Sequence, residues 1–291
     1  MTGYAIDGIR LSVAVEGNGP PVLLLHGFTG RGSTWDGLVD MLSARHRTIA
    51  VDLLGHGASD APTDPRRYGV DRQASDLATL LERLATVPAD VLGYSMGARI
   101  AMRLAVDHPA VVRRLVLESP SLGIRDDAER AARRAADEKL ARLLDSDGIE
   151  AFVDRWQAQP IFATQRALPA DVGRRLRRER LANRPEGLAA SLRGAGQGTA
   201  PPVGEELRGL AIPVLVICGS LDAVGRERAE QVRALVDDAR LEVIPGAGHA
   251  PHLERPAAFG AAVRAFLDDR HAPIDPGQSD PRVPATRTAS R

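Results

Sequence analysis

Short runs of β-forming residues alternate with helical patterns along most of this chain. In the first half, five such runs are typical of strands: residues 10–16, 21–25, 48–52, 89–93 and 114–118. Helical periodicity lies between some of them, as in residues 72–84 and 98–106. Strands that alternate with helices join through crossover connections and therefore pair in parallel. The sequence predicts an α/β fold with a mostly parallel sheet flanked by helices.

A long helical block interrupts this alternation. Residues 121–204 are rich in Arg, Ala and acidic residues and contain no convincing strand, whereas strand patterns resume at residues 212–218 and 240–244. We interpret residues 121–204 as a helical cap inserted into a core made of residues 1–120 and 205–270. Residues 271–291 have almost no large apolar side chains, so we expect a disordered tail there.

Composition excludes several classes of protein. The 38 basic and 38 acidic residues of this 291-residue chain cancel, whereas nucleic-acid binders usually carry a basic excess. No apolar run reaches the roughly 18 residues of a membrane span, and no secretory signal pattern opens the chain. Cys218 is the single cysteine, which excludes an internal disulfide or a site with several thiolate ligands. We expect a cytoplasmic globular protein with no nucleic-acid or membrane partner.

A candidate nucleophile lies in the segment Gly93-Tyr94-Ser95-Met96-Gly97, which fits the pattern Gly-x-Ser-x-Gly. The pattern alone is a weak signal, and a glycine-rich turn with an incidental serine is the alternative. Here, however, it follows an apolar run and opens a helical one. A strand, a sharp turn and a helix in that order expose the serine hydroxyl above the sheet. The context predicts that Ser95 is the nucleophile or base of an enzyme.

A serine hydroxyl needs a histidine to accept its proton and an acid to orient that histidine. After a serine in this setting, the acid and then the histidine follow in chain order. Asp222 follows the run at residues 212–218, and His249 follows the run at residues 240–244. We predict that both complete a triad with Ser95. His252 is the rival base, and a turn-forming role is the alternative for Asp222.

Developing negative charge on a substrate oxygen requires two backbone N–H donors. One is expected from Met96, directly after the serine, and the other from Phe28, in the loop after residues 21–25. No His, Asp and Glu spacing fits a metal site, and the elbow glycines do not fit a dinucleotide-binding fingerprint. The sequence therefore predicts an enzyme without a cofactor or metal.

These segments together resemble the α/β-hydrolase superfamily over about residues 5–268. The segments that carry the resemblance are His26-Gly27-Phe28, residues 52–57, the serine elbow, Asp222 and Gly248-His249. A narrower match lies in Arg99, four residues after the serine, and in cap segments at residues 118–123, 128–137, 152–162 and 180–183. This pattern resembles the 2-succinyl-6-hydroxy-2,4-cyclohexadiene-1-carboxylate synthases of menaquinone biosynthesis.

The narrower resemblance implies a lyase that eliminates pyruvate from 2-succinyl-5-enolpyruvyl-6-hydroxy-3-cyclohexene-1-carboxylate, with the triad acting as a base. It also implies a set of substrate-binding residues: Arg99, Arg133, Arg180, Tyr94 and Trp156. Planar guanidinium groups suit a small polycarboxylate because each can form paired hydrogen bonds to a carboxylate. For Arg133 and Arg180 a solvated helix face is the alternative, and for Trp156 it is a place in the core of the cap.

Two other functions share parts of this pattern. A serine hydrolase of a small ester, or of a C–C bond in a ring-cleavage product, would have the same elbow and differ in the arginines and the cap. A capped ligand receptor would retain the triad but expose an apolar patch on the cap, which the charged cap sequence disfavours. Haloalkane dehalogenases and epoxide hydrolases place an aspartate where Ser95 stands, and are excluded.

Overall fold

The computed structural model describes residues 1–269, so the predicted tail at residues 271–291 lies outside the described part. Eight strands form one sheet in the order β1-β2-β4-β3-β5-β6-β7-β8. Their bounds are β1 Thr2–Ile6, β2 Ile9–Glu16, β3 Pro21–Leu25, β4 Arg47–Asp52, β5 Ala89–Tyr94, β6 Val112–Glu118, β7 Val214–Gly219 and β8 Ala239–Ile244. The strands from β3 to β8 are parallel, whereas β1 and β2 pair antiparallel at one edge. The predicted α/β class is confirmed.

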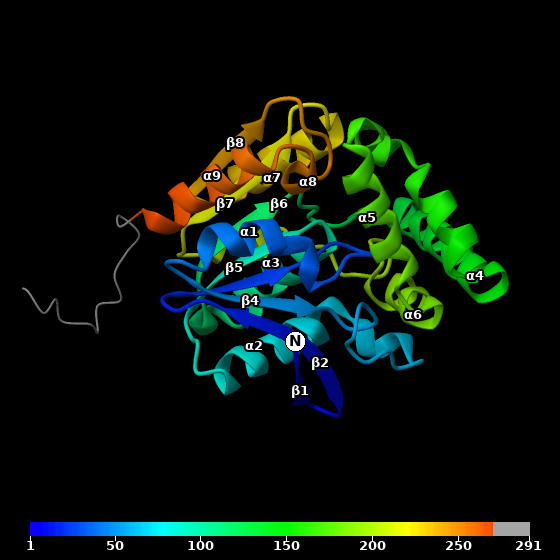
Figure 1. The fold of residues 1–291 in the computed structure, drawn as a ribbon, viewed down its shortest axis with the longest axis horizontal. Coiled ribbons are helices and arrows are strands. Elements are labelled where there is room, and N and C mark those ends of the chain that lie inside the picture. The colour runs from blue at the N-terminus through cyan, green and yellow to red at the C-terminus, as the bar shows by residue number, and fades with distance from the viewer. Residues whose placement is uncertain (270–291) are drawn as a thin grey trace, which may run out of the picture.

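Helices cover both faces of the sheet (Figure 1). The helices outside the cap are α1 Asp36–Leu42, α2 Val70–Arg83, α3 Met96–Asp107, α7 Ala223–Leu235, α8 Pro251–Glu254 and α9 Pro256–Asp268. Side chains of α2, α3 and α7 share one apolar cluster with Leu23 and Leu25 of β3, and those of α1 and α9 share a second with Val22 and Leu24. Successive residues of β3 thus face opposite layers, which explains why its sequence is apolar throughout.

Strand β1 is the one strand that the sequence pattern did not predict. Its residues are mostly exposed and pair only with β2, through the two-residue turn Asp7-Gly8, in which both residues have positive φ. An exposed edge strand has no buried face, so it shows no hydrophobic period to detect.

Four helical segments form the cap between β6 and the 3-10 helix η5 Glu205–Gly209, which precedes β7: α4 Asp127–Gln157, the 3-10 helix η4 Pro160–Ala167, α5 Ala170–Leu181 and α6 Pro185–Ala195. They pack around a third apolar cluster that includes Phe152 and Trp156. Helix α4 is broken at Gly148, whose φ of 80° is non-helical. The sequence predicts separate helices at residues 126–144 and 148–157, on either side of that break. Among residues 1–269, no helix has the length and apolarity to cross a membrane.

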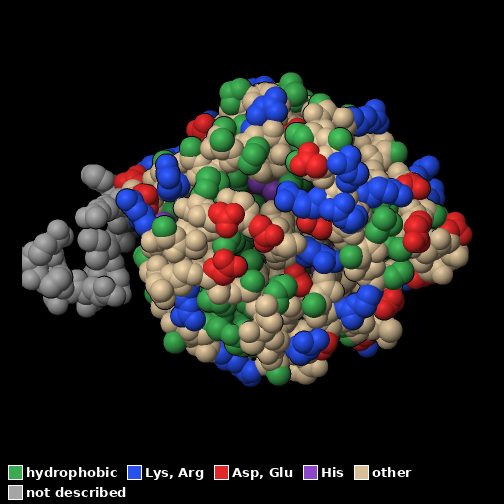
Figure 2. All heavy atoms as spheres, in the orientation of Figure 1, with side chains coloured by type: hydrophobic (Ala, Val, Ile, Leu, Met, Phe, Trp, Pro, Cys, Tyr) green, Lys and Arg blue, Asp and Glu red, His purple; other side chains and the backbone are tan. Residues whose placement is uncertain are grey.

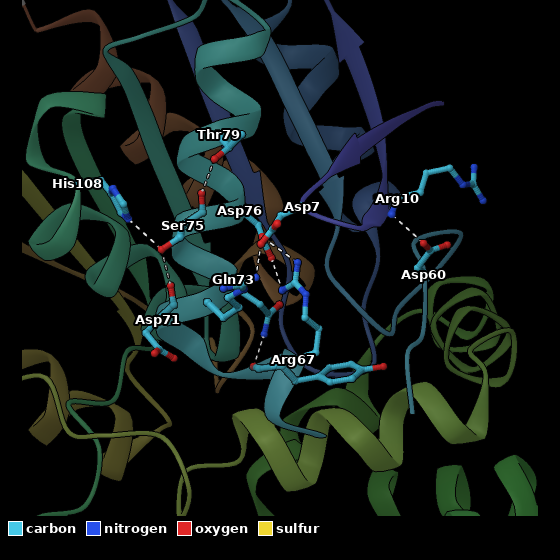
Figure 3. Close-up of polar contacts among 12 residues, drawn as sticks. Asp7, Arg10, Asp60, Arg67, Asp71, Gln73, Ser75, Asp76, Thr79 and His108 are labelled. Atoms are coloured by element: carbon cyan, nitrogen blue, oxygen red, sulfur yellow. Dashed lines mark hydrogen bonds and ion pairs between the residues drawn. The ribbon is translucent and has the colours of Figure 1, made fainter. Parts of the chain in front are cut away.

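Helix α6 lies directly against the core. A Cβ atom at Gly194 would come within 1.9 Å of the Pro65 carbonyl oxygen in the 3-10 helix η2 Pro65–Tyr68, so only glycine allows this approach. Arg67 of η2 holds both carboxylate oxygens of Asp76 in α2, at 2.6 and 2.9 Å (Figure 3). This largely buried ion pair fixes η2 to α2, and α6 packs directly against η2.

Candidate active site

Ser95 lies in the sharp turn between β5 and α3, with φ of 50° and ψ of −103°. Its amide donates to the Glu118 carbonyl of β6 at 2.9 Å. A Cβ atom at Gly93 would meet the Gly97 carbonyl at 2.4 Å, and one at Gly97 would meet the Leu25 carbonyl at 2.3 Å. The two glycines therefore permit a strained backbone that holds the serine hydroxyl at the carboxyl edge of the sheet.

Three side chains from different loops form a hydrogen-bonded chain at this edge. His249 Nε2 lies 3.2 Å from Ser95 Oγ, and His249 Nδ1 lies 2.8 Å from Asp222 Oδ2. The other Asp222 oxygen accepts the Gly225 amide at 2.8 Å. Burial alone would raise the pKa of Asp222, but the hydrogen bond and charge of His249, with the Gly225 amide, lower it below its usual value. Asp222 is therefore ionised and can orient and stabilise a protonated His249.

The loop that carries His249 is held by Glu254 of α8, which the sequence analysis did not select. Its carboxylate accepts the Gly248 amide at 2.7 Å and the Ala250 amide at 3.2 Å, on both sides of His249. Ser119 Oγ also donates to the His249 carbonyl at 2.8 Å. These contacts position the imidazole without touching its ring.

His252, the rival base, has a different partner. Its backbone amide and its Nδ1 lie 2.9 and 2.8 Å from Glu118 Oε1, and both side chains are buried. His249 contacts Ser95 and Asp222, whereas His252 packs on the rings of Trp35 and Tyr94. The geometry favours His249 as the base.

The amides of Phe28 and Met96 donate no hydrogen bond within the described part of the chain, and both residues line the cavity that Ser95 also lines. Asn183, from the cap, holds the Phe28 loop: its Nδ2 donates to the Thr29 carbonyl at 2.9 Å and its Oδ1 accepts the Gly57 amide at 3.1 Å. Asn183 lies in one of the cap segments that carry the family resemblance, but nothing in its sequence context predicts this role.

A cavity of about 560 Å³ opens above Ser95, between the sheet edge and the cap. The predicted binding residues all line it: Arg99, Arg133, Arg180, Tyr94 and Trp156. Figure 2 shows a histidine side chain in a hollow on this face, with basic side chains gathered over α5 beside it. The cavity therefore joins the serine hydroxyl to a wall of positive charge.

Each predicted arginine has one partner inside the protein. Arg99 donates to the Ala195 carbonyl of α6 at 2.7 Å, Arg133 to Asp137 at 2.9 Å, and Arg180 to Gln165 at 3.0 Å. Burial lowers the pKa of Arg99 to about 10, with Arg133 adding to the effect, and burial likewise lowers the pKa of Arg180 to about 10. Both remain charged at neutral pH, and their remaining N–H groups are available to an anion.

Aromatic side chains form the apolar part of the cavity wall. Trp156 packs edge-on against Phe28 at 5.1 Å between ring centroids, and the Phe162 ring lies 5.4 Å from that of Trp156. The guanidinium of Arg180 lies over the Phe162 ring, 5.2 Å from its centroid. Trp156 thus belongs to the core of the cap and lines the cavity as well. Burial, with Glu118 adding to it, raises the pKa of Tyr94, so this phenol is neutral.

A fourth arginine, Arg228 of α7, also lines the cavity and was missed by the sequence analysis. Basic residues are frequent in this chain, and nothing in the spacing of Arg228 distinguishes it from those on solvated helix faces. Within residues 1–269 no group of three or more His, Cys, Asp or Glu side chains is arranged to hold a metal ion.

Comparisons with known proteins agree with this architecture. Residues 20–256 match the family model described as the alpha/beta hydrolase fold. A Bacillus subtilis (strain 168) protein named "Putative 2-succinyl-6-hydroxy-2,4-cyclohexadiene-1-carboxylate synthase" is 41% identical over 90% of this chain and 96% of its own. A Serratia proteamaculans (strain 568) protein, named as a synthase of that compound, is 32% identical over 87% and 94%. The solved structure of MenH from S. aureus matches with a TM-score of 0.84 and 29% identity, over 88% of this chain and 97% of that one.

Proposed function

Because the chain belongs to the α/β-hydrolase family and, within it, to the 2-succinyl-6-hydroxy-2,4-cyclohexadiene-1-carboxylate synthases, we propose that it is a lyase that eliminates pyruvate. Its substrate is 2-succinyl-5-enolpyruvyl-6-hydroxy-3-cyclohexene-1-carboxylate, and its other product is the compound for which these relatives are named. The observation that carries the proposal is the cavity in which Ser95 and His249 lie with several arginines.

The triad acts as a base in this reaction. Ser95, whose hydroxyl proton His249 accepts, removes the ring proton next to the succinyl carbonyl. The electron pair moves onto the carbonyl oxygen and then through the ring double bond, and it expels the enolpyruvyl oxygen. Protonated His249, stabilised by ionised Asp222, returns a proton, and the released enol becomes pyruvate.

The same groups that stabilise an ester-hydrolysis intermediate serve the elimination. Phe28 and Met96 line the cavity, and their amides donate no hydrogen bond to residues 1–269. These amides stabilise the charge on the succinyl oxygen as the enolate forms. Removing one such donor typically costs about 100- to 1000-fold in rate. Arg99, Arg133 and Arg180 bind carboxylates of the substrate and hold the ring proton over Ser95.

A serine hydrolase is the alternative, because its triad would have the same geometry. The arginines argue against it: two largely buried guanidinium groups in a cavity are costly to desolvate, and an uncharged ester offers them no partner. A polycarboxylate substrate offers a carboxylate partner to each of these guanidinium groups.

The test is to incubate the purified protein with the enolpyruvyl substrate and measure pyruvate through NADH oxidation by lactate dehydrogenase. Hydrolysis of p-nitrophenyl acetate is measured in parallel. We expect one pyruvate per substrate molecule consumed, with ester hydrolysis slower by orders of magnitude. Ester hydrolysis without pyruvate release would establish the hydrolase alternative instead.

A further inference from the structure

Arg228 differs from the other arginines of the cavity in its surroundings. Arg99, Arg133 and Arg180 each donate to an oxygen of the protein. The Arg228 side chain is half-buried and makes no hydrogen bond or close ion pair with any other described residue. All five of its N–H donors are therefore available, including a fork suited to one carboxylate.

Unlike Arg133 and Arg180, Arg228 belongs to the core of the fold and not to the cap. It belongs to α7, which begins directly after the triad residue Asp222. Val224 is four residues earlier, on the same face of α7, and both side chains line the cavity. Val224 is 56% exposed and the neighbouring Leu221 is 61% exposed, so this segment forms the rim where the cavity meets solvent.

The proposed substrate carries three carboxylates, on the ring, on the succinyl chain and on the enolpyruvyl group. The first two remain on the ring product, and the third leaves as pyruvate. A leaving group must reach solvent, and the exposed residues of α7 form part of the rim through which it can leave. A cation there with no internal partner matches the one carboxylate that departs.

We propose that Arg228 binds the carboxylate of the enolpyruvyl group and so holds the leaving group at the rim of the cavity. This inference rests on the proposed function. Arg228 lies near enough to Arg99 to lower its pKa further, and near enough to Asp222 to contribute to the lowered pKa of that carboxyl. A role limited to tuning Asp222 is therefore the competing explanation, and the two roles predict different measurements.

The experiment compares Arg228→Gln with wild type and with Arg226→Gln, a control on the same helix whose exposed side chain is not part of the cavity wall. If Arg228 binds the leaving carboxylate, Arg228→Gln raises the KM of the enolpyruvyl substrate about 10- to 100-fold, with little change in kcat. Inhibition by the ring product, which lacks that carboxylate, stays within about twofold of wild type. Arg226→Gln behaves as wild type.

Three results would overturn the inference. An unchanged KM would show that Arg228 does not contact the substrate. If Arg228→Gln also weakens inhibition by the ring product, Arg228 binds a carboxylate that stays on the ring. A shifted pH profile of kcat with an unchanged KM assigns Arg228 to tuning the triad. Pyruvate release by the wild type is measured in the same assay, so failure of the proposed function is distinguished from failure of this inference.

Discussion

The sheet edge and the cap build their halves of the cavity in different ways. At the sheet edge, backbone geometry sets the positions: Ser95 lies in a strained turn between two glycines, and His249 lies in a loop held by Glu254. In the cap, long side chains such as Arg133 and Arg180 reach into the cavity and are held by single polar contacts. The backbone of the fold therefore fixes the position of the reacting groups. The choice of substrate depends on cap side chains, which can be replaced without disturbing that backbone.

The largest effect is expected from the sheet edge. Ser95→Ala removes the base but leaves the backbone contacts of the elbow, so pyruvate release should fall by about 1000- to 10,000-fold. Initial rates by the coupled assay measure this loss, and circular dichroism checks that the fold is intact. A variant that keeps more than a tenth of wild-type activity would remove Ser95 from the chemistry.

A smaller effect, on substrate binding rather than on the chemical step, is expected from the arginines that line the cavity. Arg180→Gln removes a charge that is 5% exposed and stacks on Phe162, so the KM should rise about 10- to 100-fold while kcat changes less. Arg193→Gln is the matched control, because Arg193 also lies in the cap but pairs with Glu138 and Asp145 outside the cavity wall. Equal effects of the two variants on KM would contradict a binding role for Arg180.

Asn183 connects the cap to two loops at the sheet edge, and the next prediction concerns this contact. Asn183→Ala removes the contacts of the cap with the Thr29 carbonyl and the Gly57 amide, so the loop that presents the Phe28 amide loses its support. We expect kcat to fall about 3- to 30-fold and the free energy of unfolding to fall by about 1 to 2 kcal/mol. Steady-state kinetics and urea denaturation measure the two effects. An unchanged kcat with lowered stability would limit Asn183 to a structural role.

The smallest effect is on the free energy of unfolding, and it comes from the buried histidines His26 and His56. Burial lowers the pKa of His26 to about 4 and that of His56 to about 3, with His26 adding to the second effect. Because these values lie below those of the unfolded chain, the unfolded chain binds protons first, and stability is lost as the pH falls from about 6.5 toward 4. Between pH 7 and pH 6, we expect a loss of about 1 kcal/mol.

Urea denaturation at the two pH values measures this loss. His108→Gln is the control, since His108 lies near the surface beside Ser75 of α2 (Figure 3), and we expect it to leave the loss unchanged. Equal or greater stability of the wild type at pH 6 would contradict the neutral, buried state of His26 and His56.

The sequence predicts the sheet edge better than it predicts the cap, for a physical reason. The glycines around Ser95 and the strand ends before Asp222 and His249 are local signals, because each is needed for the backbone of its own segment. The contacts of Asn183 with Thr29 and Gly57 join residues 154 and 126 positions apart, and no local pattern predicts them. Outside the cap, Arg228 of α7 was missed because the chain holds 38 basic residues and no local pattern marks this one as lining the cavity.

We propose that one cavity holds the base, the oxyanion donors and the arginines around a single polycarboxylate substrate. A crystal structure of the Ser95→Ala variant with the uncleaved enolpyruvyl substrate tests it most directly. We predict that the succinyl carbonyl oxygen lies about 2.7 to 3.1 Å from the amides of Phe28 and Met96. The carboxylates should be bound by the arginines that line the cavity. A substrate bound with its carboxylates in solvent and its succinyl oxygen away from both amides would contradict the account.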